Sequence, residues 1–254
     1  MRRIHGSVRY LATLVLWGGL SSSQAAIVVN GTRVIFNEAA NETTVQLRNV
    51  GEQAVLAQVW VDDGDFAATP EGATSPFILT PPVVRIDPGA GQAIRLIRKD
   101  GVPERQRETL YWLNVVEVPP KPSANLAAGD NLLMFSFRTR LKVFYRPVAL
   151  ASGAERAHEH LCFRYDAASE KLHARNPSPF HVTFRRAALE RADGSVVGEL
   201  LREQDRMIGP GGHRAFALRM TGNPSSDMAV RYSVINDHGG DTWGQGENAT
   251  SCPM

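Results

Sequence analysis

Short segments of β-type residues, each ended by a turn, follow one another along nearly the whole chain. Residues 43–49 alternate apolar with polar side chains, which is typical of a strand with one buried face, and residues 93–97 form a further β-type segment. Between them, Asp87-Pro88-Gly89 predicts a turn, because proline fixes φ and glycine supplies a positive φ. No long helical period is present. Strands of this length and spacing predict a β-sandwich.

A change of pattern at residues 146–150 divides the chain into two sets of strands. The first set also includes residues 27–29 with 32–36, 54–61 and 109–118. The second set comprises residues 161–165, 171–175, 181–189, 215–219 and 228–235. Each set suits a sandwich of about a hundred residues. The sequence therefore predicts an all-β protein with an N-terminal domain over residues 26–147 and a C-terminal domain over residues 148–254, joined by a short hinge.

The first 25 residues have the order of a secretory signal peptide. Arg2 and Arg3 precede an apolar run, and small residues lead up to Ala25. A membrane anchor is the alternative, but the apolar run is too short to span a bilayer comfortably. No later segment is apolar enough to cross one, so stable membrane insertion is not expected. We predict that residues 1–25 are removed during export and that the mature chain begins at Ala26.

Composition and motifs exclude several classes of function. The chain carries 28 basic and 26 acidic residues, so no overall field favours nucleic acid or an anionic membrane. Neither a glycine-rich nucleotide motif nor a hydrolase or metalloprotease motif is present. His158, Glu159 and His160 lie in a polar stretch without a further ligand at a suitable spacing. The sequence therefore predicts a protein that is not an enzyme and uses no metal or other cofactor.

The chain has two cysteines, Cys162 and Cys252, both in its last third. Export would allow them to form a disulfide. Such a bridge would close a loop of about ninety residues and contribute about 4 kcal/mol in the chain-entropy description. The alternative is two unpaired, buried thiols. Both remain open at this point, because bridging depends on the distance between the two Cα atoms.

An apolar row stands out within residues 133–147. Leu133, Phe135 and Phe137 occupy every second position, and basic residues follow them. If this stretch forms one strand, the three side chains point the same way. The lead-in over residues 126–131 is small and polar, so nothing indicates burial on both faces. Because an exposed apolar edge promotes aggregation, we interpret the row as a surface that pairs with another chain.

Seven short motifs, in order across both predicted domains, resemble those of the periplasmic chaperones of the chaperone–usher pilus pathway. They lie at residues 32–36, 80–89, 107–114, 117–120, 142–147, 176–183 and 235–240. The resemblance covers nearly the whole chain after the leader. It implies two immunoglobulin-like β-sandwich domains in a boomerang arrangement, residence in the periplasm, and membership of the short-loop subclass.

The resemblance also implies a specific function. A pilus subunit is an immunoglobulin-like domain without its last strand, and its open apolar groove would make it aggregate. The chaperone lends an edge strand to that groove (donor-strand complementation) until the outer-membrane usher exchanges it for the next subunit. By this resemblance Leu133, Phe135 and Phe137 are the donor residues. The implied partners are therefore pilus subunits and the usher.

Two basic residues match cleft positions of the family. Arg33 lies in a Thr-Arg-Val motif, and Lys142 begins the motif that ends at Pro147. By the resemblance they hold the C-terminal carboxylate of the subunit, which suits two cations, one able to bind bidentately. The alternative for each is an ordinary surface residue. Lys142 lies an odd number of residues from Phe137, so a regular strand would point them to opposite faces. Twist, a bulge or the use of different surfaces must reconcile the two roles.

Three charged residues match an inter-domain salt-bridge network of the family: Glu108, Arg146 and Asp237. Arg146 lies at the predicted hinge, so such a network would set the angle between the domains. Exposed ion pairs contribute only ~0–1 kcal/mol, so orientation is a better role for it than stability. The alternative is three unconnected surface charges. Cys162 and Cys252 match no closely spaced cysteine pair of the family, so the resemblance does not support their bridge.

Two rival functions remain to be compared with the chaperone. A secreted β-sandwich pilus subunit would need a free N-terminal donor extension and an incomplete domain, whereas here the first strand begins almost at the predicted cleavage site. A carbohydrate-binding module would need an aromatic platform or clustered carboxylates, and only 7% of the residues are aromatic. We therefore favour the chaperone. Self-association of the free chain through its apolar edge is left open.

Overall fold

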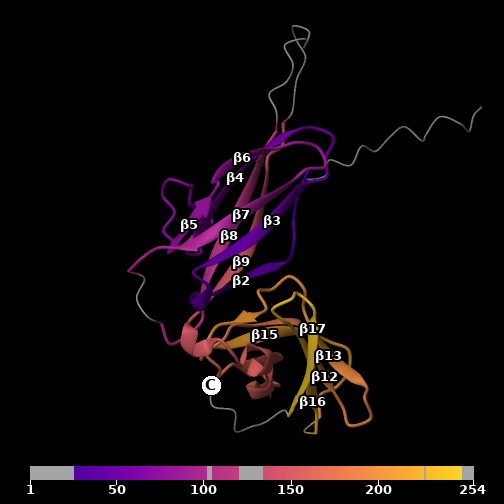
Figure 1. Cartoon of the computed structure of the whole chain (residues 1–254). Coiled ribbons are helices and arrows are strands. Elements are labelled where there is room, and N and C mark those ends of the chain that lie inside the picture. The colour runs from indigo at the N-terminus through magenta and orange to yellow at the C-terminus, as the bar shows by residue number, and fades with distance from the viewer. Residues whose placement is uncertain (1–25, 102–104, 120–133, 226, 248–254) are drawn as a thin grey trace, which may run out of the picture.

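The computed structural model describes residues 26–101, 105–119, 134–225 and 227–247. Strands dominate these residues, and their helical elements are three short 3-10 helices: η1 (Glu38–Ala40), η2 (Val148–Leu150) and η3 (Ala154–His160). Figure 1 shows two β domains that meet at an angle, with the N-terminal domain above and the C-terminal domain below. The predicted fold class, all-β with two immunoglobulin-like sandwiches in a boomerang arrangement, is confirmed. The predicted domain limits stay a prediction.

Two sheets pack face to face in the N-terminal domain. The first has the order β1 (Ile27–Val29), β3 (Glu42–Asn49), β7 (Gly91–Arg98) and β5 (Phe77–Thr80). The second has the order β2 (Arg33–Asn37), β9 (Phe137–Arg146), β8 (Thr109–Val118), β4 (Val55–Asp62) and β6 (Val83–Ile86). Alternate residues of both sheets fill one core, among them Phe36, Leu47, Leu96 and Leu113. The alternation in the sequence therefore marks the buried face of each strand.

The predicted turn at Asp87 connects β6 to β7 and so joins the two sheets of this domain. The amide of Ala90 donates to the carbonyl of Asp87 at 3.0 Å, and Gly89 has a φ of 72°. Nearby, the buried Asn49 side chain donates to the carbonyls of Gln53 and Ile86 at 2.8 and 2.9 Å. Because Asn49 belongs to one sheet and Ile86 to the other, this amide ties the sheets together.

Two predicted strands differ from those in the structure. The first strand region divides into β1 and β2, which belong to different sheets, and Gly31 between them has a φ of 106°. The strand expected from residue 133 begins only at Phe137, because Met134–Ser136 do not pair with β8. Instead, the hydroxyl of Ser136 donates to the carbonyl of Glu117 at 2.7 Å. Leu133 lies outside the described residues.

Eight strands form the C-terminal domain. Their path is β10 (Cys162–Asp166), β11 (Lys171–Arg175), β15 (His213–Met220), β13 (Val196–Leu200), β12 (Val182–Glu190), β16 (Ala229–Ile235) and β17 (Asp241–Glu247), with β14 (Met207–Ile208) beside β12. Four rings meet in its core, those of Phe163, Phe184, Phe216 and Tyr232. The sequence did not predict β13, β14 or β17, whereas the other five strands lie close to their expected ranges.

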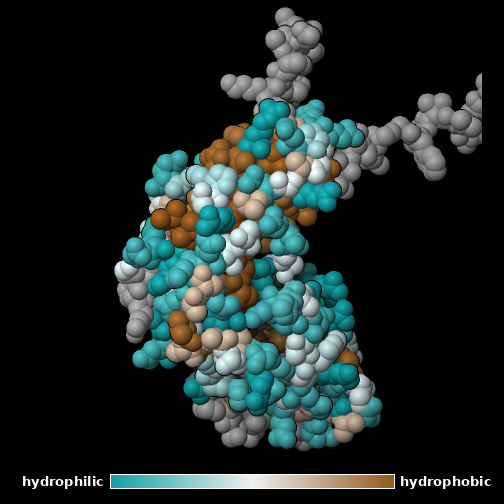
Figure 2. Space-filling view, in the orientation of Figure 1, coloured by the Kyte–Doolittle hydropathy of each residue, from teal (hydrophilic) through white to brown (hydrophobic). Residues whose placement is uncertain are grey.

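The two domains present different surfaces. Most of the large apolar side chains that the described residues expose lie in the N-terminal domain, including Met134 and Phe135 beside the start of β9. Figure 2 shows this difference: hydrophobic colour gathers on the upper part of the N-terminal domain, while the C-terminal domain is mainly hydrophilic on the visible face. No helix among the described residues is long and apolar enough to cross a membrane.

Candidate functional site

Strand β2 runs parallel to β9 and places Arg33 directly beside Lys142. The register of paired Cα atoms runs from Arg33 with Lys142 to Asn37 with Arg146. Side chains at paired positions of neighbouring strands lie on the same face of a sheet. The two cations that the sequence singled out are thus brought together by a pairing of strands that are far apart along the chain.

The two faces of β9 have different tasks. Leu141, Val143 and Tyr145 point into the core of the N-terminal domain. Lys142, Phe144 and Arg146 therefore point to the opposite face. The pairing of β9 with β8 is regular over its whole length and contains no bulge. Phe137 accordingly lies on the face opposite to Lys142, so the odd spacing between them is resolved by the use of different faces.

Arg33 and Lys142 are half-buried cations, and neither forms a salt bridge with a described residue. The Arg33 guanidinium donates to the carbonyl of Ile235 at 2.9 Å, while its Nε has no hydrogen-bond partner. It also lies 5.6 Å from the ring centroid of Phe144. Lys142 Nζ lies 5.6 Å from the ring centroid of Trp112. Burial lowers the pKa of both side chains, because neither charge is fully solvated. Within the described ranges, no carboxylate is close enough to pair with either of these two cations.

Below these cations, Arg146 bridges the two domains. Its guanidinium binds the Glu108 carboxylate at 2.9 Å and the Asp237 carboxylate at 2.7 Å. Glu108 and Arg146 are only 4% and 6% exposed. Burial acts to lower the pKa of Arg146, but the hydrogen bond with Asp237 and the charge of Glu108 outweigh it and raise that pKa. The three residues form one network rather than separate surface charges.

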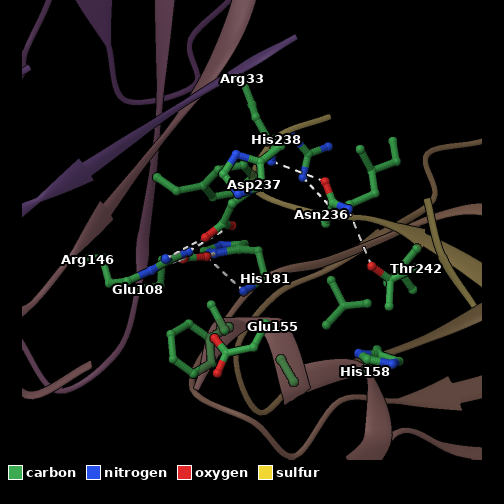
Figure 3. Close-up of a pocket in the computed structure, with 17 residues that line it drawn as sticks. Arg33, Glu108, Arg146, Glu155, His158, His181, Asn236, Asp237, His238 and Thr242 are labelled. Atoms are coloured by element: carbon green, nitrogen blue, oxygen red, sulfur yellow. Dashed lines mark hydrogen bonds and ion pairs between the residues drawn. The ribbon is translucent and has the colours of Figure 1, made fainter. Parts of the chain in front are cut away.

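His181 is a fourth member of this network that the sequence did not reveal. Its backbone amide donates to Glu108 Oε1 at 2.9 Å, and its Nδ1 lies 2.9 Å from the same oxygen. Figure 3 shows Arg146, Glu108 and His181 close together, with Asp237 above them. His181 lies within the family-like motif at residues 176–183, which marks the segment as one of interest. The neighbouring residues in the sequence do not indicate a contact with Glu108.

A cavity of about 270 Å³ lies where the domains meet. Residues from both domains line it, and the charged network forms part of its wall (Figure 3). The lining includes Arg33, Phe144 and Arg146 from the N-terminal domain and His158, His181 and Asp237 from the C-terminal domain. Arg33 therefore lies at the junction of the domains, where an acidic group could reach it from the cavity.

The edge of β9 is partly unpaired. Strand β2 covers it only from Lys142 to Arg146, and no other described strand pairs with the stretch from Phe137 to Leu141 on that side. Phe135, just before this stretch, is 56% exposed, and Phe137 is half-buried. Backbone groups along such an edge are free to bind another strand.

The outer face of β9 carries an arginine cluster that the sequence did not reveal. Arg140 binds the fully buried Asp62 carboxylate at 2.7 Å, and Arg138 lies 3.6 Å from it. The two guanidinium groups lie 4.8 Å from the ring centroids of Trp112 and Trp60, respectively. One carboxylate thus serves two arginines, which leaves this face positively charged next to Lys142.

Two remaining predictions concern cysteines and metals. Cys162 is the first residue of β10 and is half-buried, while Cys252 lies outside the described residues. Their bridge stays a prediction. His158, Glu159 and His160 lie in η3. Within the described part of the chain, no group of three or more His, Cys, Asp or Glu side chains is arranged to hold a metal ion.

Comparison with known protein families identifies the class of protein that carries this fold and site. The model described as "Pili and flagellar-assembly chaperone, PapD N-terminal domain" matches residues 26–151, and "Pili assembly chaperone PapD, C-terminal domain" matches residues 156–245. The chain therefore belongs to the PapD-like family of pilus-assembly chaperones, a family of periplasmic proteins that are not enzymes. The predicted family and the predicted lack of enzymatic activity are confirmed.

Individual relatives agree with this assignment. The probable fimbrial chaperone YadV of Escherichia coli K12 is 38% identical over 224 residues, which cover 87% of this chain and 89% of YadV. The chaperone FimB/FhaD of Bordetella pertussis is 37% identical over 226 residues, 87% of each chain. The crystal structure of the Pseudomonas aeruginosa CupB2 chaperone has a TM-score of 0.71 at 32% identity and covers 87% of this chain and 100% of that one. The chain is accordingly a pilus-assembly chaperone.

Proposed function

We propose that this chaperone holds a pilus subunit by donor-strand complementation and anchors the subunit's C-terminal carboxylate between Arg33 and Lys142. The observation that carries the proposal is a pair of half-buried cations without a carboxylate partner among the described residues, placed where an unpaired strand edge begins. A carboxylate there would supply the missing charge and two strong hydrogen bonds.

The proposed anchor implies a direction for the client strand. The unpaired edge runs from Phe137 to Leu141, and the cations lie just beyond its C-terminal end. A strand whose last residue contacts Arg33 and Lys142 while its earlier residues pair along this edge must run parallel to β9. It would then lie in line with β2, which is also parallel to β9.

Apolar side chains would add affinity to the backbone pairing. Leu133, Phe135 and Phe137 are the proposed donor residues, and Phe135 is largely exposed. Full burial of one large apolar side chain contributes about 1.5–3 kcal/mol, before the cost of ordering the interface. The complex would therefore be firm, while the strand remains replaceable.

The remaining parts of the proposal concern export, domain orientation and delivery of the subunit. Residues 1–25 direct export to the periplasm and are cleaved after Ala25. The Arg146 network keeps the two domains at the angle that presents both Arg33 and the β9 edge to the client. The subunit then passes to the outer-membrane usher. Without a client, the exposed edge promotes self-association of the chaperone.

The carboxylate anchor can be tested by co-expression with a pilus subunit from the same genome. We expect Arg33→Ala and Lys142→Ala each to lower the amount of co-purified subunit at least tenfold, because each removes a cation from the anchor. Arg48→Ala is the control, since Arg48 is an exposed cation on β3 in the other sheet. Full recovery of the subunit with both anchor variants would refute the anchor.

The donor strand requires a separate test with the same subunit. Phe135→Asp should abolish recovery, because a charge would enter the apolar groove of the client. The matched control is Ile78→Asp, which changes another exposed apolar residue of the same domain, on β5. Equal loss with both variants, or none with either, would contradict the assignment of the donor row.

A further inference from the structure

Glu117 is a buried carboxylate without a cationic partner among the described residues. It is 9% exposed and lies near the end of β8, on the core side of the strand. Its Oε2 accepts hydrogen bonds from the backbone nitrogens of Ala26 and Ile27 at 2.8 and 3.0 Å. Two amides satisfy the oxygen but carry no net charge. A buried carboxylate is costly unless a positive charge neutralises it.

The position of Ala26 is held by three neighbours. Its nitrogen donates to Glu117, and its carbonyl accepts a hydrogen bond from the amide of Val50 at 2.8 Å. Gly51 packs so closely that a Cβ at that position would lie 2.7 Å from the Cβ of Ala26. A glycine is therefore needed at position 51 to admit Ala26. These contacts hold the nitrogen of Ala26 at the carboxylate, so the folded domain defines the geometry of the site.

We propose that Glu117 is the binding site for the α-ammonium group that forms at Ala26 when the leader is removed. This inference rests on the proposed cleavage after Ala25. Before cleavage the nitrogen of Ala26 is an amide with a single hydrogen. Hydrolysis of the bond between Ala25 and Ala26 converts it into an amine, which takes up a proton and becomes a cation at the same position. That cation supplies the charge that the Glu117 site lacks.

The strength of the interaction changes with cleavage. The Glu117 carboxylate already strengthens its hydrogen bond with the Ala26 amide in the precursor, and after cleavage the charge of the ammonium adds a Coulomb attraction to that bond. The mature chain thus gains a partly buried ion pair between its first residue and β8. The leader-bearing precursor makes the same contact without the charge, so its N-terminal domain is less stable before cleavage than after it.

The ion pair lies next to the proposed client-binding edge. Glu117 is the paired partner of Phe137, the first residue of β9. Its carbonyl accepts the hydrogen bond from the Ser136 hydroxyl at 2.7 Å. Glu117 therefore contacts the start of the mature chain through its side chain and the start of the donor edge through its backbone. Removal of the leader would strengthen the support of this edge.

Amide hydrogen exchange on the purified two-domain protein tests the proposal. One form begins at Ala26 with a free amine, produced by a protease that leaves no extra residue. A second form retains Gln24 and Ala25, so that the nitrogen of Ala26 stays an amide. We expect the amides of Ile27 and Val50 to exchange about tenfold more slowly in the first form, since both are bonded to the anchored segment. Equal exchange in the two forms would overturn the proposal.

Glu117→Gln identifies the carboxylate responsible. In this variant the tenfold difference between the forms with and without the two extra residues should disappear, because the neutral amide of Gln lacks the charge that attracts the ammonium. Glu52→Gln is the control, as Glu52 is an exposed carboxylate next to Gly51 and should leave the tenfold difference intact. A difference that persists in Glu117→Gln would also overturn the proposal.

The test is independent of client binding and of export. Both forms keep Glu117, so the first comparison stands even if Glu117→Gln folds poorly. The mass of the exported protein separately reports where the leader is cleaved. A different cleavage site would refute the proposed export boundary, while the exchange experiment alone decides whether Glu117 binds an ammonium at Ala26.

Discussion

At the scale of single residues, Glu38 in η1 connects β9 to η2, the 3-10 helix that follows it. Its Oε1 accepts a hydrogen bond from the Tyr145 hydroxyl at 2.8 Å, and its Oε2 accepts one from the amide of Val148 at 3.0 Å. The bond from Tyr145, followed by that from Val148, lowers the pKa of Glu38. Burial and the same carboxylate raise the pKa of Tyr145 to about 12.

The lowered pKa of Glu38 predicts a pH dependence of stability. Because the folded state favours the ionised carboxylate, its contribution is fully present above the ordinary pKa of 4.5 and is lost as pH falls through the lowered value. Glu38→Gln should cost about 1–3 kcal/mol at neutral pH and remove this acid-dependent loss. Urea unfolding from about pH 7 down to about pH 3 measures both. Glu71→Gln, an exposed loop change, should alter neither.

Lys142 predicts a pH dependence of the opposite kind, in client binding. Burial lowers its pKa below the ordinary 10.5; Asp205 opposes this shift, and Arg33 and Arg214 add to it. A carboxylate binds the protonated amine, so affinity is present below the lowered pKa and falls as pH rises through it. A peptide with the sequence of a subunit's last strand and a free carboxylate would report the profile.

Lys142→Arg provides the matched variant for this profile. Arginine stays protonated at alkaline pH, so the variant should keep its affinity where the wild type loses it. The same peptide with an amidated C-terminus should bind weakly at every pH. Identical profiles for the wild type and the Lys142→Arg variant, or no effect of amidation, would show that Lys142 does not contact the carboxylate.

At the scale of elements, β17 shows why one strand was missed. Gly244 and Gly246 lie within it and weaken any strand prediction from sequence. In the structure they provide space: a Cβ at Gly244 would lie 2.5 Å from the ring of Tyr232, and one at Gly246 would lie 2.5 Å from the ring of Phe163. The glycines are therefore required by the aromatic core against which β17 packs.

A substitution in β17 tests this packing. Gly246→Ala should destabilise the C-terminal domain by about 1–3 kcal/mol, because the ring of Phe163 must move to admit the methyl group. Gln245→Ala is the control, since Gln245 lies on the other face of the strand. Thermal unfolding followed by near-ultraviolet circular dichroism would measure the difference. Equal melting temperatures for the two variants would contradict the packing.

Strand β9, unlike β17, was predicted from the sequence, although its start and its neighbour β2 were not. The odd spacing of Phe137 and Lys142 indicated opposite faces for a regular strand, and the regular pairing with β8 selects this interpretation over a twist or a bulge. The start of β9 was predicted four residues too early, since the apolar row continues beyond the strand. The parallel pairing of β9 with β2 could not be predicted from the sequence. The residue pattern of each strand indicates a strand but does not indicate its neighbour in the sheet.

At the scale of the whole molecule, the Arg146 network is expected to set the angle between the domains. Asp237 is its most exposed member, so Asp237→Asn removes one ion pair while Glu108 still neutralises Arg146. We expect both domains to remain folded and the range of inter-domain angles to widen. Small-angle X-ray scattering should then show a broader pair-distance distribution. Asp205→Asn, which removes an ion pair within the C-terminal domain, should leave it unchanged.

The sequence by itself determined the features that depend on neighbouring residues: the all-β class, the turn at Asp87 and the two faces of β9. Alternation and turn formation are local, because the next few residues decide them. The tertiary structure decided which distant segments meet. It placed Arg33 beside Lys142, added His181 to Glu108 and brought Ala26 to Glu117. Each of these contacts arises because core packing brings together segments that are far apart in the chain, and no local pattern records that packing.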